Sequence, residues 1–211
     1  MPYDLTPLIL TLKLSIITTA ILLVIGIPLA YWLAFERRAW KYPIEALVSM
    51  PLVLPPTVLG FYLLVALSPH AMAFSFVGLV IGSVIFSLPF MVNPLKAGFQ
   101  NVPQGLIDAS DTLGKSRWET LCRVVLPNIK PALLTGIVMA FAHTVGEFGV
   151  VLMIGGNIPG ETQTAAIAIF SEVEALNYQT ANFYAIIMVV ISFTILLALC
   201  WFNRKQVRMT F

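Results

Sequence analysis

Charged residues and cysteines are scarce in this 211-residue sequence. Asp, Glu, Lys and Arg make up 10% of it, against about 25% in ordinary soluble domains, whereas 59% of the residues are hydrophobic. A water-soluble domain could not cover its core with so few ionic groups. Two cysteines, Cys122 and Cys200, argue against a disulfide framework, and we expect both to be packing residues. The net charge of +2 is too small to indicate nucleic-acid binding.

Long apolar runs occupy most of the chain instead. A helix needs about 20 apolar residues to cross a bilayer, and five stretches meet that requirement. The predicted spans cover residues 8–35, 44–67, 76–95, 131–154 and 183–202. No repeat or linker separates a second unit. We therefore predict one all-α transmembrane domain over residues 1–211, a bundle of about five helices in a lipid bilayer.

Lysines and arginines sort to one side of this predicted bundle. They follow the first span, fill the segment between the third and fourth spans, and end the chain. The positive-inside tendency assigns these segments to the cytoplasm, which puts the N-terminus outside and the C-terminus inside. The longest external loop, residues 155–182, should contain a short helix after Thr164. Lys13 is the exception, and its amine can extend to the outer interface.

The predicted cytoplasmic loop, residues 101–127, has the pattern of a helical hairpin. Pro103 suits a first helical turn, and Gly114 suits the left-handed position after a helix end. Ser116 with Glu119 forms a capping box that opens a second helix, which should end near Pro127. A small apolar face on the first helix needs a protein partner; the alternative is a hairpin lying on lipid headgroups.

This loop resembles the motif of permease subunits of ATP-binding-cassette (ABC) importers. The family pattern is Glu-Ala-Ala, three residues, Gly, nine residues, Ile, one residue, Leu-Pro. Asp108-Ala109-Ser110, Gly114, Val124 and Leu126-Pro127 stand at the same spacing here. The resemblance implies a coupling helix that inserts into a separate ATPase subunit. The docking residues that it implies are Leu106, Asp108, Ala109, Ser110, Leu113, Gly114, Leu126 and Pro127.

ATP hydrolysis is then the task of that partner. Gly114-Lys115-Ser116 imitates the end of a phosphate-binding loop, but Ala109 stands where that motif needs glycine. We expect this chain to be a transport subunit rather than an enzyme and to bind no cofactor, with ATP and Mg²⁺ on the partner.

The second predicted span should be broken. Residues 50–60 contain three prolines and a glycine, and each proline removes an amide donor and crowds the carbonyl four residues back. Freed backbone groups are costly in lipid, so we expect this segment to line a solute pathway; the alternative is a merely kinked helix. Pro89 and Pro94 should disturb the third span similarly. The predicted pathway residues here are Pro51, Pro55, Pro56, Thr57 and Gly60.

The fourth predicted span holds two ionisable residues. His143 and Glu147 are four residues apart and should share one helix face, close enough to pair. Pairing would lower the cost of a carboxylate in the membrane. The spans offer no nucleophile–base set and no cluster of metal ligands, so we expect neither catalysis nor a metal site. A structural or gating pair is favoured over direct solute contact.

Three more segments resemble the molybdate/tungstate permease subunits in particular. They are residues 51–60, residues 146–149 (Gly-Glu-Phe-Gly) and residues 156–164 (Gly-Asn-Ile-Pro-Gly-Glu-Thr-Gln-Thr). Sulfate permeases share the loop motif and a Gly-Glu-aromatic-Gly segment, so the first and third segments favour molybdate. Residues 155–164 are expected to form an outer contact or gate, with a plain surface loop as the alternative. The predicted external contacts are Asn157, Pro159, Gly160, Glu161 and Thr162.

The sequence thus predicts a permease subunit of type I ABC importer fold in the inner (plasma) membrane of a prokaryote. The expected partners are a second copy of the chain, two ATPase subunits and an extracytoplasmic molybdate-binding protein. Molybdate or tungstate would cross by alternating access. A sulfate or other oxyanion permease, an ion-coupled secondary transporter and a non-transporting scaffold stay open. Paired repeats, typical of secondary transporters, are absent from the sequence.

Overall fold

Helices are the only regular elements among residues 4–207, the range that this computed structural model describes, with side chains through Trp201. The α-helices are α1 (Thr6–Phe35), α2 (Lys41–Ser49), α3 (Pro56–Leu67), α4 (Phe76–Gln100), α5 (Gln104–Thr112), α6 (Arg117–Thr120), α7 (Leu126–Asn128), α8 (Lys130–Gly146), α9 (Gly149–Gly155), α10 (Ala165–Glu174) and α11 (Tyr178–Val207). Two 3-10 turns, η1 (Met50–Leu52) and η2 (Ser68–His70), and a π-helix, η3 (Leu121–Val125), complete the order. The all-α prediction is confirmed.

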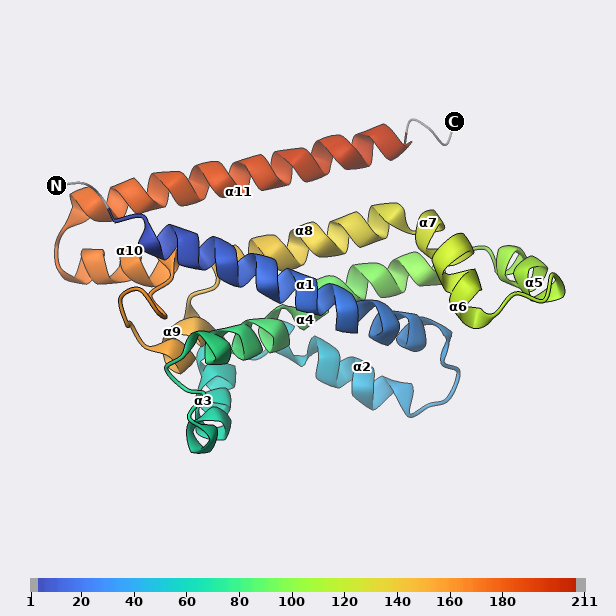
Figure 1. Cartoon of the computed structure of the whole chain (residues 1–211), viewed down its shortest axis with the longest axis horizontal. Helices are drawn as coiled ribbons and strands as arrows, with labels where there is room; N and C mark the ends of the chain where they lie inside the picture. The colour runs from blue at the N-terminus through green and yellow to red at the C-terminus, as the bar shows by residue number, and fades with distance from the viewer. Residues whose placement is uncertain (1–3, 208–211) are drawn as a thin grey trace.

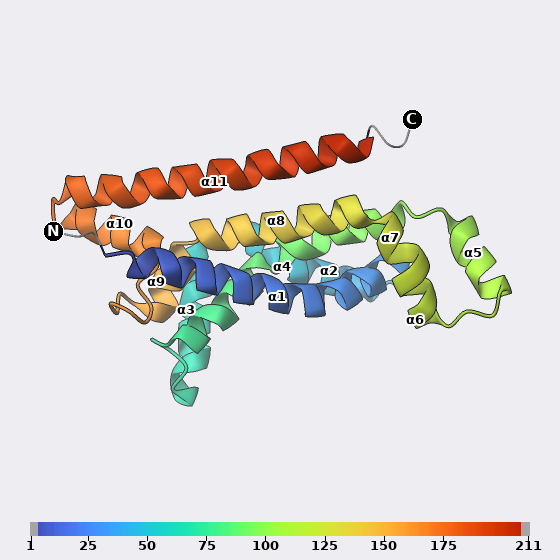
Figure 2. The same ribbon diagram turned by 45° about the horizontal axis from the view of Figure 1, so that its top comes forward.

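Three helices form the frame of the molecule. α1, α4 and α8 pack against one another, α3 packs against α9, and α10 packs against α11 (Figure 1). The hairpin that contains α5 and α6 projects from one end of this frame (Figure 2). α10 confirms the short helix predicted after Thr164.

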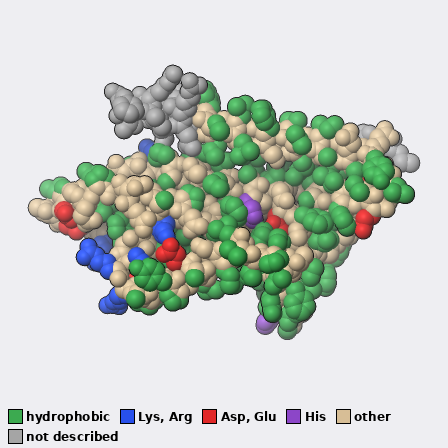
Figure 3. Space-filling model, turned by 180° about the vertical axis from the view of Figure 1, so that it is seen from behind, with side chains coloured by type: hydrophobic (Ala, Val, Ile, Leu, Met, Phe, Trp, Pro, Cys, Tyr) green, Lys and Arg blue, Asp and Glu red, His purple; other side chains and the backbone are tan. Residues whose placement is uncertain are grey.

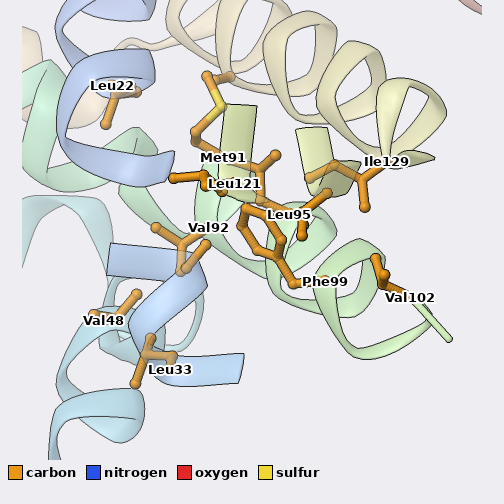
Figure 4. Close-up of a cluster of buried hydrophobic side chains, with 13 residues drawn as sticks. Leu22, Leu33, Val48, Met91, Val92, Leu95, Phe99, Val102, Leu121 and Ile129 are labelled. Carbon is orange, nitrogen blue, oxygen red and sulfur yellow. The ribbon is translucent and has the colours of Figure 1, made fainter. Parts of the chain in front are cut away.

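The largest buried cluster lies where the frame meets the hairpin. Figure 4 shows its labelled side chains, which are Leu22, Leu33, Val48, Met91, Val92, Leu95, Phe99, Val102, Leu121 and Ile129. Phe99 is fully buried, and the Tyr31 ring meets it edge-on at 5.4 Å between centroids. Such contacts between membrane helices stabilise through close packing rather than through loss of water. They attach the base of the hairpin to α1 and α4.

Three membrane spans are single continuous helices in the described part of the chain. α1, α4 and residues 178–201 of α11 are each long and apolar enough to cross. Two bent pairs pass the same test only when each counts as one span. They are residues 41–52 with 56–70, bent by 109°, and residues 117–128 with α8, bent by 80°. The count reaches the predicted five only with these pairs included.

Three expectations about local packing and helix continuity are wrong. Pro89 and Pro94 lie inside α4, which runs unbroken through both. The span predicted at residues 131–154 is two helices, α8 and α9, with two residues between them. Cys122 and Cys200 are exposed free thiols and not packing residues.

Lysine and arginine side chains gather at the end of the molecule that carries the hairpin (Figure 3). We call this the basic end. Its Lys and Arg residues are Arg37, Arg38, Lys41, Lys96, Lys115, Arg117, Arg123 and Lys130. Lys96 forms an ion pair with Glu45, which ties α4 to α2. Lys13 lies apart from this group on α1, with its Nζ 4.7 Å from the centroid of the Phe76 ring.

Candidate functional site

The turn of the hairpin is built around Gly114. α5 ends at Thr112 with Leu113 as its C-cap, and Gly114 adopts φ +70°, the left-handed conformation that suits glycine. The Lys115 N–H donates to the Ser110 carbonyl at 3.1 Å, and the Gly114 N–H donates to the Asp111 carbonyl at 2.9 Å. This pair of bonds is a Schellman motif. The predicted helix end is confirmed.

The second arm of the hairpin starts at a capped serine. Ser116 Oγ accepts the Glu119 N–H at 3.2 Å, which confirms half of the predicted capping box. The Glu119 carboxylate instead accepts from Lys115 Nζ at 2.9 Å and lies 3.1 Å from Arg123 Nη1. The pKa of Glu119 is lowered, mainly by the hydrogen bond from Lys115. A run of α6, η3 and α7 then ends at Asn128, next to the predicted Pro127.

A shallow groove of about 260 Å³ follows one side of α5. Four predicted docking residues line it, namely Leu106, Ala109, Ser110 and Leu113. Leu106 is 40% exposed and Leu113 75% exposed, so the groove offers apolar surface. Ser110 is buried, and its hydroxyl lies 2.7 Å from Thr120 Oγ1, a contact between α5 and α6 that no sequence motif signals.

The other predicted docking residues lie off the groove. Asp108 is exposed on α5, and its Oδ1 accepts from Gln104 Nε2 at 3.1 Å. Leu126 is partly buried against the main core, whereas Pro127 is exposed. The groove lies between α5 and the second arm, which contributes Glu119, Arg123 and Val124, and Leu126 anchors that arm to the core.

The second predicted span breaks at its prolines. Pro51 is buried in η1, and Pro55 has φ −54° and ψ 133°, an extended conformation that ends the first half and starts α3 at Pro56. The two halves meet at 109°. Thr57, in the first turn of α3, is exposed. The predicted break is confirmed, and it is a sharp turn rather than a kink.

A second break follows α8, and it overturns the predicted pair of His143 and Glu147. α8 ends at Gly146, so Glu147 lies outside the helix with ψ 131°. No hydrogen bond or ion pair joins the two side chains within the described part of the chain. Glu147 is 8% exposed, and its Oε1 accepts the Val150 N–H at 2.7 Å, which caps the start of α9.

His143 has different partners, on α4. Its Nδ1 is hydrogen-bonded to Ser87 Oγ at 3.0 Å, and Ser87 Oγ lies 2.9 Å from Thr144 Oγ1. The imidazole stacks on Phe90 with 3.9 Å between ring centroids. These contacts hold α8 against α4. No sequence motif indicated Ser87, which lies in an apolar run one helical turn after Ser83.

The two breaks pack directly on each other. A Cβ on Gly149, the first residue of α9, would lie 2.7 Å from Pro56 Cβ, the first residue of α3. Gly60 is buried one turn further along, where a Cβ would lie 2.7 Å from Met153 Cβ. We call this contact of α3 with α9 the break junction. It brings together the predicted pathway residues Pro56 and Gly60 and the segment that follows Glu147.

The loop after α9 is held in one shape by its own polar groups. Thr162 is fully buried, donates to the Gly155 carbonyl at 2.7 Å and accepts the Ile158 N–H at 3.1 Å. Thr162, a predicted external contact, thus offers no exposed surface in this structure. Asn157 is exposed and donates to Ser171 Oγ at 2.7 Å. The remaining exposed residues of the loop tip are Ile158, Pro159, Gly160 and Glu161.

A family model described as "Binding-protein-dependent transport system inner membrane component" matches residues 23–208. The chain belongs to this family. It is thus a multi-pass inner-membrane component of such a system, and its relatives are named as permeases. ModB, the molybdenum transport system permease protein of Azotobacter vinelandii, is 48% identical over 93% of each chain. YvgM of Bacillus subtilis, a putative molybdenum transport system permease protein, is 32% identical over 90% of each.

A probable sulfate transport system permease protein of Nephroselmis olivacea, cysT, is 31% identical to this inner-membrane component, over 97% of this chain and 77% of the relative. Among solved structures, an inward-facing MetNI methionine ABC transporter chain superposes with a TM-score of 0.76 at 18% identity, covering 94% of both chains. That likeness shows the type I ABC importer permease fold.

Proposed function

We propose that this chain is the membrane subunit of an ATP-driven importer that carries molybdate or tungstate by alternating access. The assignment of the substrate rests on the 48% identity, over 93% of both chains, to a molybdenum transport permease. Sulfate is the second candidate, because a sulfate permease is 31% identical, but that alignment leaves about a quarter of the relative uncovered.

The membrane interior suits passage of a dianion rather than its retention. Residues 42–95 and 131–203 contain no Lys or Arg. A cation buried in low dielectric would hold a dianion too strongly for release. Next to the break junction, the exposed Thr57 hydroxyl can hydrogen-bond to a passing oxyanion. Five helical segments barely enclose such a path, so two copies would share it.

The groove along α5 would receive a separate ATPase subunit at the cytoplasmic face. ATP and Mg²⁺ bind to that partner in this proposal. Closure of two ATPase subunits would draw two hairpins together and open the outer side, and hydrolysis would reverse the motion. The loop tip at Pro159, Gly160 and Glu161 then lies outside, where an extracytoplasmic molybdate-binding protein delivers the ion.

Competition in the assembled transporter tests the substrate. Membrane vesicles that contain this chain, its ATPase and its binding protein should take up radiolabelled molybdate, and unlabelled tungstate should compete. A large excess of sulfate should leave the rate unchanged. Inhibition by sulfate equal to that by tungstate would favour the sulfate permease, and uptake by the purified chain alone would remove the ATP-driven mechanism.

Co-purification with the ATPase tests the docking site. Gly114→Pro cannot adopt φ +70°, and Asp108→Arg reverses the charge beside the groove, so both should abolish association while the protein still inserts. Glu174→Arg is the control charge reversal, because Glu174 is exposed at the end of α10, outside the hairpin. Retained co-purification in the first two variants would count against the docking role.

The exposed thiol of Cys122 tests the orientation. Cys122 lies on the second arm of the hairpin, so a membrane-impermeant maleimide should label it in inside-out vesicles and not in intact cells. Cys122→Ser identifies the labelled site. Labelling from outside intact cells would reverse the topology.

A further inference from the structure

A cavity of about 490 Å³ lies at the basic end, between the last turn of α1 and the hairpin. Nothing in the proposed transport cycle uses it. Gln104, Ile107 and Asp111 form its wall on α5, whereas Leu106 and Leu113 line the docking groove. The short helix α5 thus separates the cavity from the groove. A ligand in the cavity would contact the face of α5 that is turned away from the groove.

The lining of this cavity carries three arginines and two acids. Arg37, Arg38 and Arg117 contribute to it, and within the described residues none of their guanidinium groups forms an ion pair. Glu36 and Asp111 are the two acids. Glu36 Oε1 already accepts the N–H groups of Arg37 and Arg38 at 2.9 Å each, so it is engaged by the loop backbone. Unpaired guanidinium groups are planar forks that match phosphate oxygens.

The depth of the cavity in the bilayer follows from α1. This helix has 30 residues and is about 45 Å long, whereas the hydrocarbon core is about 30 Å thick. Its last turns therefore reach the headgroup region. Tyr31 and Trp32 line the cavity there, and Trp32 lies 4.8 Å from Trp40 between ring centroids. Tyr and Trp are the side chains enriched at that level of a membrane.

We propose that this cavity binds the phosphate headgroup of an anionic lipid such as phosphatidylglycerol. The three arginines bind the phosphate oxygens, and the side chains of Gln104 and Asp111 can hydrogen-bond to the glycerol hydroxyls. Because α1 forms one wall and α5 the other, the bound lipid links a membrane span to the docking helix. It thereby sets the position in which α5 meets the ATPase. This site does not depend on which ion is transported.

Lipid titration of the full-length wild-type protein gives the first test. The protein is purified in detergent, titrated with phosphatidylglycerol or phosphatidylcholine, and examined by native mass spectrometry. Phosphatidylglycerol should bind about tenfold more tightly, since each basic residue near the surface attracts anionic lipid. Equal binding of the two lipids overturns the proposal, whether or not any variant folds.

Paired arginine variants locate the site. Arg38→Gln with Arg117→Gln should lower phosphatidylglycerol affinity about tenfold or more. Arg123→Gln should leave it unchanged, because Arg123 lies outside the cavity and pairs with Glu119. An equal loss in both proteins overturns the assignment. Displacement of the lipid by millimolar inorganic phosphate or molybdate overturns the lipid as occupant and indicates a free oxyanion.

Discussion

Proline has opposite effects in two membrane segments of this chain. Between α2 and α3 the consecutive prolines Pro55 and Pro56 end one helix and start another at 109°. In α4, Pro89 and Pro94 leave the helix continuous. A residue before proline is pushed out of the α region, and at Pro55 that residue is itself a proline with φ already fixed. α4 also packs against both α1 and α8, which over-determines its path.

The break after α8 needs no proline at all. Glu147 caps α9 through its carboxylate, so the Val150 N–H at the break has a partner in the protein. The comparison shows that proline content alone does not locate a break. A break forms where neighbouring groups can accept or donate the hydrogen bonds of the backbone in its bent conformation.

The largest effect should follow from removing the proline pair. Pro55→Ala with Pro56→Ala relieves about 3 kcal/mol of helix disruption per proline, so residues 50–67 should straighten. Molybdate uptake by the assembled transporter should fall roughly 100-fold, with normal insertion into the membrane. Pro94→Ala is the control and should keep uptake. Normal uptake in the double variant would show that the break has no role in the pathway.

The next effect is steric, at the break junction. Gly149→Leu places a side chain where Pro56 Cβ is only 2.7 Å from a Cβ, and such overpacking costs about 1–3 kcal/mol. Thermal unfolding in detergent should occur at a lower temperature. Gly105→Leu, which meets no atom within 4 Å of its Cβ, should unfold near the wild-type temperature. Equal melting of both variants would contradict the close contact.

Removal of the cap on α9 should have a somewhat smaller effect. Glu147→Ala leaves the Val150 N–H without its acceptor and should destabilise by about 1–2 kcal/mol. Glu147→Gln keeps a carbonyl oxygen in place and should lose less. Hydrogen exchange at the Val150 amide measures the difference. Fast exchange in both variants would mean that the charge matters and not the acceptor.

The smallest change should be a gain, in α4. Pro94→Ala restores an amide donor to a helix that is already continuous, which should stabilise by about 1 kcal/mol. Thermal unfolding in detergent measures it. A loss of stability would show that α4 depends on the proline ring for packing.

Local chemistry allowed the sequence to predict the hairpin and the first break. The residues responsible are Gly114, Ser116 and the paired Pro55 and Pro56. Each of them fixes the backbone of its neighbours in the chain, so its effect can be predicted from the sequence alone. The pairing of His143 with Glu147 failed because helical spacing means nothing once the helix has ended.

Contacts between distant segments were out of reach of the sequence. The Ser87 contact with His143, the meeting of Pro56 with Gly149, and the arginine-lined cavity all join parts of the chain that are far apart in the sequence. Even the glycines on either side of Glu147 and Phe148 gave only a weak signal of a break.

α8 joins the two regions that these variants probe. It starts at the base of the hairpin and ends at the Glu147 break, and its 17 residues make a rod about 25 Å long. A swing of about 5° pivoted at its hairpin end would carry its far end sideways by about 2 Å. That displacement is about the van der Waals radius of a methyl group, enough to loosen or tighten the break junction between α3 and α9. A small movement of the hairpin can thus change the packing of α3 on α9 through α8.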